Sequence, residues 1–467
     1  MKIFLLSAVV ALISQIPSAS AQPPSVLPTP SDADIRRILV RRIDVEKQGI
    51  GIVVGIVSPA GRRIVAYGSP GVGDKRPLDG DTLFEIGSMT KVFTSLILMD
   101  MVQKHEVSLD DPVSKFLPAS VNVPERAGRK ITLRDLSTQT SGLPRMPTNF
   151  HPRDPGNPYA DYTEDRLFSY LSAYTLPRDI GSIYEYSNVG VGLLGTALGR
   201  KAGESYESMV RSRILGVLGM NDTAVALSPR LKSRLAIGHN TALKPVRNWD
   251  FSALAGAGAL RSTANDMLTF LAANLDLVKS PLAPAMAAEV SARRPTLTPH
   301  LEIAYGWHVF TSNGKVIYWH NGQTAGYHGF MGYDPATHVG VVILSNVGSF
   351  TGIDDLGHHL LDPAAPLAKF TPPKTHMAIS VDEKSLEPFP GEYQLAPNFV
   401  ITVTMSGDHL FAQATGQIRF ELFPEGPGMF FAKVTELAIV FKTDAKGVTT
   451  GLILHQAGMD MAAKRIP

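Results

Sequence analysis

Apolar positions along the chain follow two different periods. From Ile50 to Val57 the residues are β-branched and glycine-rich, Ser58-Pro59-Ala60-Gly61 provides turn residues, and Arg63 to Tyr67 returns, which predicts a β-hairpin. From about residue 88 to residue 277, apolar residues recur at helical spacing between long loops rich in proline and glycine. This middle part is therefore predicted to be mainly helical.

Strand-like runs return late in this region. They are Tyr305–Thr311, Lys315–His320, Gly326–Tyr333 and Val339–Leu344. Strands at both ends of a region, with helices between them, predict an α+β fold in which one antiparallel sheet is built from both ends and flanked by helices.

The last part of the chain has a different pattern of hydrophobic and polar residues. Residues 368–380, with Pro372-Pro373, are predicted to be a linker between a domain over 22–367 and a second domain over 381–467. Short alternating runs separated by glycines then follow: Ile401–Met405, Gln417–Leu422, Met429–Lys433, Leu437–Phe441 and Leu452–Leu454. This spacing predicts a small all-β barrel or sandwich.

The first residues have the pattern of a cleavable signal peptide. Met1-Lys2 precedes an apolar run, and Ala19-x-Ala21 precedes a proline-rich stretch. We therefore predict a signal peptide over residues 1–21, cleaved after Ala21, and a secreted or periplasmic product. The apolar run is shorter than the ~20 residues of a membrane span, and no later run is long enough, so we predict no stable membrane span after cleavage.

Composition narrows the possible chemistry. The 467 residues contain 44 Lys+Arg against 42 Asp+Glu, a balance that gives no electrostatic footprint for nucleic acid. Because there is no cysteine, a thiol nucleophile, a disulfide or a thiolate-bound zinc is excluded. His358-His359 are adjacent and no His-Glu-x-x-His occurs, so no metal is predicted. Gly190–Gly195 fits a dinucleotide-binding pattern, but no strand precedes it; close helix packing is favoured, and no cofactor is predicted.

A serine and a lysine open the first long helix of the middle region. In Ser88-Met89-Thr90-Lys91 the two side chains lie three residues apart and hence on one helix face. A hydroxyl beside an amine is a workable nucleophile pair. The motif is weak alone, because Ser312–Lys315 matches it too and a capped helix start explains the first copy equally well.

Two further segments carry suitable polar groups. Tyr186-Ser187-Asn188 places a phenol and a carboxamide on one loop, although an ordinary loop tyrosine would give the same letters. His320-Asn321-Gly322-Gln323 lies at the end of a predicted strand, where a glycine lets a substrate backbone approach the strand edge. His338-Val339-Gly340 is similar, but His320 is preferred because a glycine-bearing turn is expected to follow it.

These segments, in this order, resemble the serine β-lactamases and penicillin-binding proteins, particularly the branch of class C β-lactamases, D-peptidases and family VIII esterases. The resemblance covers most of residues 30–365. Further matching stretches are Phe84–Lys91, Ser108–Val113, Thr140–Pro144, Leu218–Thr223 and Ala257–Thr263. The C-terminal module resembles the lipocalin-like domain often fused to such hydrolases.

The resemblance implies a role for each motif residue. Ser88 would attack a carbonyl to form an acyl-enzyme, and Lys91 and Tyr186 would share the proton transfers. Asn188 would orient the substrate amide, and His320 would bind the substrate carboxylate or relay a proton. Gly322 would let the substrate approach the strand, and the backbone N–H groups of Ser88 and Gln323 would form an oxyanion hole.

Two positions depart from the class C pattern. His320-Asn321-Gly322 stands where class C β-lactamases have Lys-Thr-Gly, and Gln139 stands where many relatives have histidine. We therefore expect a secreted serine hydrolase that cleaves an amide, either a β-lactam or a D-amino-acid peptide such as a peptidoglycan fragment. A carboxylic esterase or D-alanyl peptidase using the same residues is the first alternative. A non-enzymatic relative whose β domain binds cell-wall material or a partner is the second.

Overall fold

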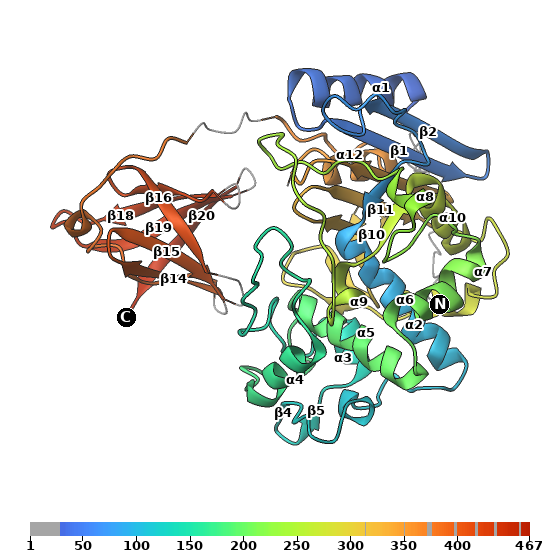
Figure 1. The fold of residues 1–467 in the computed structure, drawn as a ribbon, viewed down its shortest axis with the longest axis horizontal. Coiled ribbons are helices and arrows are strands. Elements are labelled where there is room, and N and C mark those ends of the chain that lie inside the picture. The colour runs from blue at the N-terminus through green and yellow to red at the C-terminus, as the bar shows by residue number, and fades with distance from the viewer. Residues whose placement is uncertain are drawn as a thin grey trace, which may run out of the picture.

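A computed structural model describes residues 29–467 except 313, 350, 371–375, 397–398, 416–418, 434–436 and 457–458. The predicted signal peptide over 1–21 and part of the predicted linker lie outside the described residues. The ribbon has a larger part that combines helices with a sheet and a smaller all-β part beside it (Figure 1).

The larger part is built on an eight-stranded sheet with the order β2-β1-β12-β11-β10-β9-β8-β7. All neighbouring strands are antiparallel. The strands are β1 (Gly51–Ser58), β2 (Gly61–Gly68), β7 (Arg294–Pro295), β8 (Leu301–Ile303), β9 (His308–Ser312), β10 (Lys315–Gln323), β11 (His328–Asp334) and β12 (Val339–Ser345). Because β1 pairs with β12, the expectation of one sheet built from both ends is confirmed.

Helices cover both faces of this sheet, as expected. The helices are α1 (Asp32–Val40), α2 (Thr90–Gln103), α3 (Leu133–Ser137), α4 (Glu164–Ala173), α5 (Asn188–Ala202), α6 (Tyr206–Val210), α7 (Gly216–Leu218), α8 (Pro229–Lys232), α9 (Ala255–Gly258), α10 (Ala264–Asn274), α11 (Ala283–Glu289) and α12 (Asp354–Leu361). Along β1, Ile52 and Val54 pack with α1 and α12, whereas Val53 and Val57 belong to the core that contains α2 and α10. This alternation follows from the two-residue period of a strand. Among the described residues, no helix has the length and apolarity needed to cross a membrane.

Several short elements connect these layers. The helical turns are η1 (Arg41–Val45), η2 (Gly87–Met89), η3 (Val113–Phe116), η4 (Arg211–Leu215) and η5 (Glu383–Ser385). Two small sheets pair β3 (Leu83–Glu85) with β6 (Arg261–Thr263) and β4 (Glu125–Arg126) with β5 (Arg129–Lys130). The sequence pattern did not predict these small sheets, since strands of two or three residues carry no detectable period.

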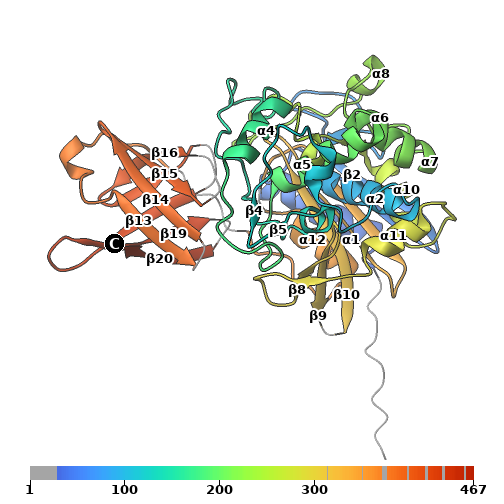
Figure 2. The ribbon, with the colours of Figure 1, turned by 90° about the horizontal axis from the view of Figure 1, so that it is seen from below.

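The smaller part is a closed eight-stranded antiparallel barrel (Figure 2). Its strands are β13 (Gly391–Ala396), β14 (Phe399–Ser406), β15 (His409–Ala414), β16 (Phe420–Gly426), β17 (Met429–Phe431), β18 (Leu437–Thr443), β19 (Thr449–Gln456) and β20 (Met459–Ile466). Pairing of β13 with β20 closes it. The expected all-β module is thus a barrel, and the sequence runs had missed β13, β15 and β20.

Candidate active site

The predicted pair of Ser88 and Lys91 comes together at the start of α2. The turn η2 carries Ser88, and one helical turn later Lys91 places its Nζ 3.0 Å from the serine Oγ. Lys91 is fully buried, whereas Ser88 is partly exposed. The serine hydroxyl is therefore accessible while its amine partner is shielded from water.

The Lys91 amine has two more oxygen neighbours. Its Nζ lies 2.8 Å from Asn188 Oδ1 and 2.7 Å from the carbonyl oxygen of Ala257. Burial, assisted by the charge of Arg145, lowers the pKa of Lys91 well below its ordinary value. A neutral amine has two N–H groups, which the Asn188 and Ala257 oxygens accept, and one lone pair. That lone pair is left for the hydroxyl proton of Ser88.

Close helix packing places the Ala257 carbonyl. The short helix α9 lies between α2 and α5, where Thr94 Oγ1 donates to the Gly256 carbonyl at 2.7 Å. A Cβ added to Gly195 would lie 3.0 Å from the Cα of Gly256. The glycines of the segment 190–195 therefore serve helix packing within α5, in agreement with the interpretation favoured from the sequence.

Tyr186 faces the same serine. Its hydroxyl is hydrogen-bonded to the Ser88 side chain. The centre of its ring lies 4.8 Å from Lys91 Nζ and 4.9 Å from the guanidinium carbon of Arg145. Burial raises the pKa of Tyr186 above its ordinary value, although the charge of Arg145 and the bond to Ser88 oppose this. The phenol is therefore protonated at neutral pH.

Gln139 holds the loop that carries Tyr186. The side-chain oxygen of Gln139 accepts the Ser187 N–H at 2.7 Å, and its carbonyl accepts the Glu185 N–H at 2.9 Å. The Ser187 hydroxyl donates to the carbonyl of Pro144 at 2.7 Å. Gln139 itself is buried and adopts a positive φ of 56°. Gln139 thus makes a backbone contact on each side of Tyr186.

The strand that carries His320 is longer than predicted. We expected it to end at His320 with a glycine turn after it, but β10 continues to Gln323. The reason is its pairing with β11, which continues to the pair Gln323–His328. On the other edge, pairing with β9 stops at Trp319. The last residues of β10 therefore present an edge that β9 does not cover.

This edge touches the turn that carries the serine. A Cβ at Gly322 would lie 1.9 Å from the carbonyl oxygen of Ile86 and 2.9 Å from the backbone nitrogen of Ser88. A Cβ at Gly87 would lie 2.8 Å from the backbone nitrogen of Gln323. Only glycine fits at position 322, since any side chain would collide with main-chain atoms. The backbone of Gln323 is thereby brought against η2, while its side chain donates to the Gly348 carbonyl at 3.0 Å.

His320 lies behind Tyr186, with ring centres 6.3 Å apart. It is fully buried, its Nδ1 contacts the carbonyl of Asn321, and its Nε2 has no hydrogen-bond partner in the described part of the chain. Burial lowers the pKa of His320 well below its ordinary value, and the neighbouring His308 and Lys91 act in the same direction. The imidazole is neutral at neutral pH.

His308 is a site residue that sequence reasoning missed. It is buried on β9, its ring centre is 4.9 Å from that of His320, and its Nε2 lies 3.0 Å from the hydroxyl oxygen of Tyr184. Burial and the charge of Lys91, against the opposing charge of Asp354, lower the pKa of His308 to about 4. No motif surrounds it, so no sequence signal distinguishes it from any histidine in a strand.

The second copies of two motifs, which contain His338 and Lys315, make structural contacts away from the candidate site. His338 Nδ1 is 3.2 Å from the carbonyl oxygen of Leu275, and Lys315 pairs with Asp362 at 2.7 Å. Across the described ranges, no three His, Asp or Glu side chains gather in an arrangement that could hold a metal ion.

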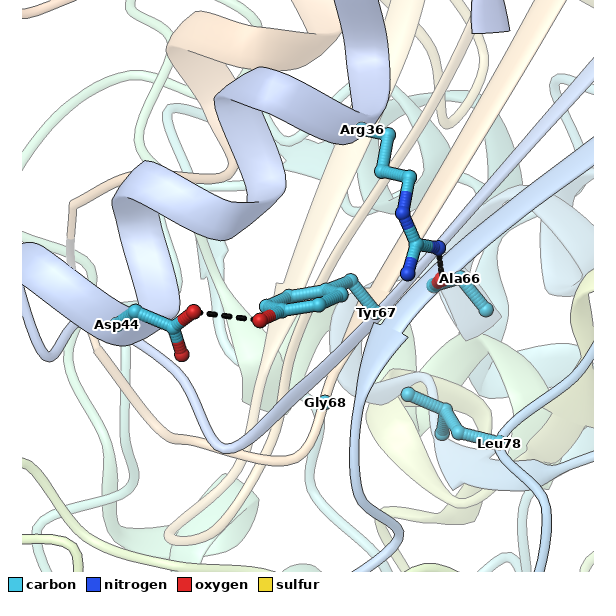
Figure 3. A pocket seen from close by; sticks show the side chains of 6 residues that line it. All are labelled: Arg36, Asp44, Ala66, Tyr67, Gly68 and Leu78. Carbon is cyan, nitrogen blue, oxygen red and sulfur yellow. Dashed lines mark hydrogen bonds between the residues drawn. The ribbon is translucent and has the colours of Figure 1, made fainter. Parts of the chain in front are cut away.

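A hollow of about 340 Å³ lies elsewhere, on β2 beneath α1 (Figure 3). Its polar groups are paired with one another: Tyr67 donates to Asp44 at 2.5 Å, and the Arg36 guanidinium stacks 5.1 Å from the Tyr67 ring centre. Its lining includes none of Ser88, Lys91 and Tyr186, so this hollow is separate from the candidate active site.

Comparison with known proteins identifies the family of the larger part of the chain. The beta-lactamase family model matches residues 37–364. The chain belongs to the beta-lactamase family. Residues 375–466 match a second model, described as a domain of unknown function (DUF3471). The resemblance that the sequence motifs indicated is thereby confirmed for the larger part of the chain.

Individual relatives cover different shares of the chain. It is 32% identical over 221 residues to the D-alanyl-D-alanine-carboxypeptidase/endopeptidase AmpH of Escherichia coli, an alignment that covers 47% of this chain and 56% of that protein. This chain thus spans little more than half the length of that relative. It is 25% identical over 378 residues to a beta-lactamase of Lysobacter lactamgenus, covering 73% of this chain and 93% of the relative.

Solved structures show the same fold. A beta-lactamase/D-alanine carboxypeptidase from Yersinia pestis, complexed with citrate, matches with a TM-score of 0.61 and 24% identity over 70% of this chain and 96% of its own. A class C beta-lactamase from Rhodobacter sphaeroides matches with a TM-score of 0.58 and 25% identity, over 67% and 93% respectively. The antiparallel sheet flanked by helices is therefore the β-lactamase fold.

Proposed function

We propose that this chain is a secreted serine hydrolase that cleaves an amide through an acyl-enzyme on Ser88. One observation carries the proposal: a fully buried lysine amine lies 3.0 Å from the Ser88 hydroxyl while two other oxygens occupy its N–H groups. A buried amine with a lowered pKa is a base that can accept the serine proton at neutral pH.

Acylation follows from these contacts. Ser88 Oγ forms a bond to the substrate carbonyl carbon while its proton passes to the lone pair of Lys91. The Tyr186 hydroxyl, which is bonded to Ser88, supplies a proton to the leaving amine and is reprotonated from Lys91. The C–N bond breaks, the amine departs and the acyl group stays on Ser88.

The backbone N–H groups of Ser88 and Gln323 are proposed to hold the oxyanion, because β10 brings Gln323 against η2. Such a donor is worth about 3 kcal/mol of transition-state stabilisation. Asn188 Oδ1 accepts a hydrogen bond from Lys91, and its Nδ2 contacts the weak acceptor Met146 Sδ at 3.4 Å. The Asn188 side chain also interacts with Tyr159, and its Nδ2 is proposed to orient the substrate carbonyl. Water then attacks the acyl carbon and gives a proton to the same Tyr186–Lys91 pair. The bond from this carbon to Ser88 Oγ breaks, Ser88 takes the proton back, and the carboxylic acid departs.

The substrate proposed first is a D-amino-acid peptide or a β-lactam, as the names of the relatives AmpH and beta-lactamase suggest. Peptidoglycan fragments would be the peptide source. A carboxylic ester is the second candidate, because the neutral, buried His320 stands where class C enzymes have the cation of Lys-Thr-Gly. Secretion remains a proposal based on the sequence of residues 1–21 alone.

The test is turnover and adduct formation with four probes: a penicillin, a chromogenic cephalosporin, a p-nitrophenyl ester and a D-alanyl peptide. We expect hydrolysis of at least one amide and a mass increase on the peptide that contains Ser88. Ser88→Ala should abolish both. Ser312→Ala, in the second Ser-x-x-Lys copy, is the matched control and should retain activity. Turnover of the ester alone would favour the esterase, and absence of both turnover and adduct would favour the binding relative.

A further inference from the structure

Arg145 is an exposed cation at the edge of the candidate site. It follows Pro144, and its guanidinium carbon lies 4.9 Å from the ring centre of Tyr186. Several other arginines of this domain are paired with acids, as Arg178 is with Glu185. Within the described residues, the Arg145 guanidinium has neither an ion pair nor a hydrogen bond. It therefore has its donors free for a group outside the chain.

The other basic side chains that the structure describes at the candidate site, Lys91, His308 and His320, are buried. Lys91 is buried and its three contacts lie within the protein. His308 and His320 are buried, and burial lowers the pKa of each imidazole, so both are neutral at neutral pH. The nearby Asp354 is bonded to His328 at 2.9 Å, so it does not compete for Arg145. Arg145 is thus the cation that an anionic substrate would meet.

The position of Arg145 is fixed from two sides. Its carbonyl oxygen accepts the N–H of Asn188 at 3.0 Å, which ties its backbone to the start of α5. Its guanidinium lies over Tyr186, whose hydroxyl reaches Ser88. Stacking on an aromatic face leaves the edge of the guanidinium available, and this edge matches a carboxylate in a bidentate pair.

We propose that Arg145 determines specificity by binding a carboxylate of the substrate next to Tyr186. This inference rests on the proposed acyl-enzyme function and deepens it by naming the substrate class, acyl compounds that carry a carboxylate. It gives Arg145 the carboxylate-binding role that the family resemblance had suggested for His320, which is neutral and inaccessible.

The test uses two matched pairs of aryl esters. In one pair the phenol leaving group carries either a meta-carboxylate or a meta-carboxamide; in the other pair the acyl chain ends in a carboxylate or in its amide. For each protein, kcat and KM are measured at its own pH optimum. The ratio of kcat/KM for the charged member over the neutral member is the readout, since general damage to the site cancels in this ratio.

For Arg145→Met we expect this ratio to fall about tenfold in at least one pair, mainly through a higher KM, because one charged hydrogen-bonded pair is lost. Arg145→Lys should retain part of the ratio, since it keeps the charge but not the planar fork. Arg211→Met is the control and should leave the ratio unchanged, because Arg211 is exposed and has no ion pair with any residue that the structure describes.

Unchanged ratios in both pairs for Arg145→Met, with neutral esters still hydrolysed, would overturn this inference and leave the proposed function standing. Failure of the wild-type protein to hydrolyse any member would instead contradict the proposed function.

Discussion

The two parts of this molecule bury very different side chains. The hydrolase part encloses Lys91, Glu289, His308 and His320 with at most 7% of each exposed. The barrel core, in the part of it that the structure describes, is apolar apart from a few groups such as Tyr393, whose hydroxyl donates to the Phe389 carbonyl at 2.6 Å. Isolated buried ionisable groups cost several kcal/mol unless they are neutralised or paired. The hydrolase part therefore carries a stability cost that the apolar barrel core avoids.

The largest difference between the two parts should appear when one methyl group is added to each of them. Gly322→Ala would force β10 away from η2, because its Cβ would lie 1.9 Å from the Ile86 carbonyl oxygen. We expect kcat/KM to fall about 10³-fold as the oxyanion donors separate. Gly447→Ala, in the barrel, meets open space but has a φ of 80°. It should cost about 1 kcal/mol of stability and leave kcat/KM unchanged. Full activity of Gly322→Ala would show that this edge takes no part in the reaction.

A cavity in the barrel should affect stability alone. Leu452 is fully buried there, so Leu452→Ala should destabilise the barrel by about 3 kcal/mol. All three tryptophans, Trp249, Trp307 and Trp319, lie in the hydrolase part. Tryptophan fluorescence in urea therefore reports that part, while far-UV circular dichroism reports both. We expect an earlier transition by dichroism with an unchanged fluorescence midpoint and unchanged kcat/KM. A common shift of both midpoints would mean that the two parts unfold as one unit.

The smallest effect is expected from a buried acid. Burial raises the pKa of Glu289 well above its ordinary value, so the folded state holds a proton that the unfolded state releases above about pH 4.5. Stability is therefore lost as the pH rises towards the folded-state pKa. Glu289→Gln should gain stability over the wild type as pH increases from 5 to 8, by an amount on the order of 1 kcal/mol. Exposed Glu387→Gln in the barrel should show no such trend, and parallel stability curves for Glu289→Gln and the wild type would refute the assignment.

The sequence predicted the motif residues because their chemistry is local. Ser88 and Lys91 are one helical turn apart, and Tyr186 and Asn188 share one loop, so short patterns identify them. The antiparallel sheet was predictable for a similar reason, since β1 and β12 have long β-branched runs. The beta-lactamase family model matches residues 37–364, a range that includes all three segments.

The missed features depend on distant backbone. The backbone carbonyl of Ala257 contacts Lys91, which lies 166 residues away in the sequence. Every residue has a backbone carbonyl, so no sequence motif could identify this one. The extension of β10 to Gln323 depends on continued pairing with β11. In the barrel, β15 is interrupted by the polar residues His409 and Gln413, and β20 mixes charged residues with apolar ones. Closure depends on the pairing of β13 with β20, strands at opposite ends of the domain.

The pairing of β1 with β12 has a consequence for how the protein is made. Gly51 donates to Asn346, 295 residues further along the chain. At translation rates of about 5–20 residues per second, the partner strand would emerge roughly 15–60 s after the hairpin. During that interval one edge of an apolar hairpin stays bare and can pair with a neighbouring nascent chain. The yield of folded protein should therefore depend on how well nascent chains are kept from pairing with one another. In the folded protein this edge of β1 is covered by β12, so the requirement applies only during synthesis.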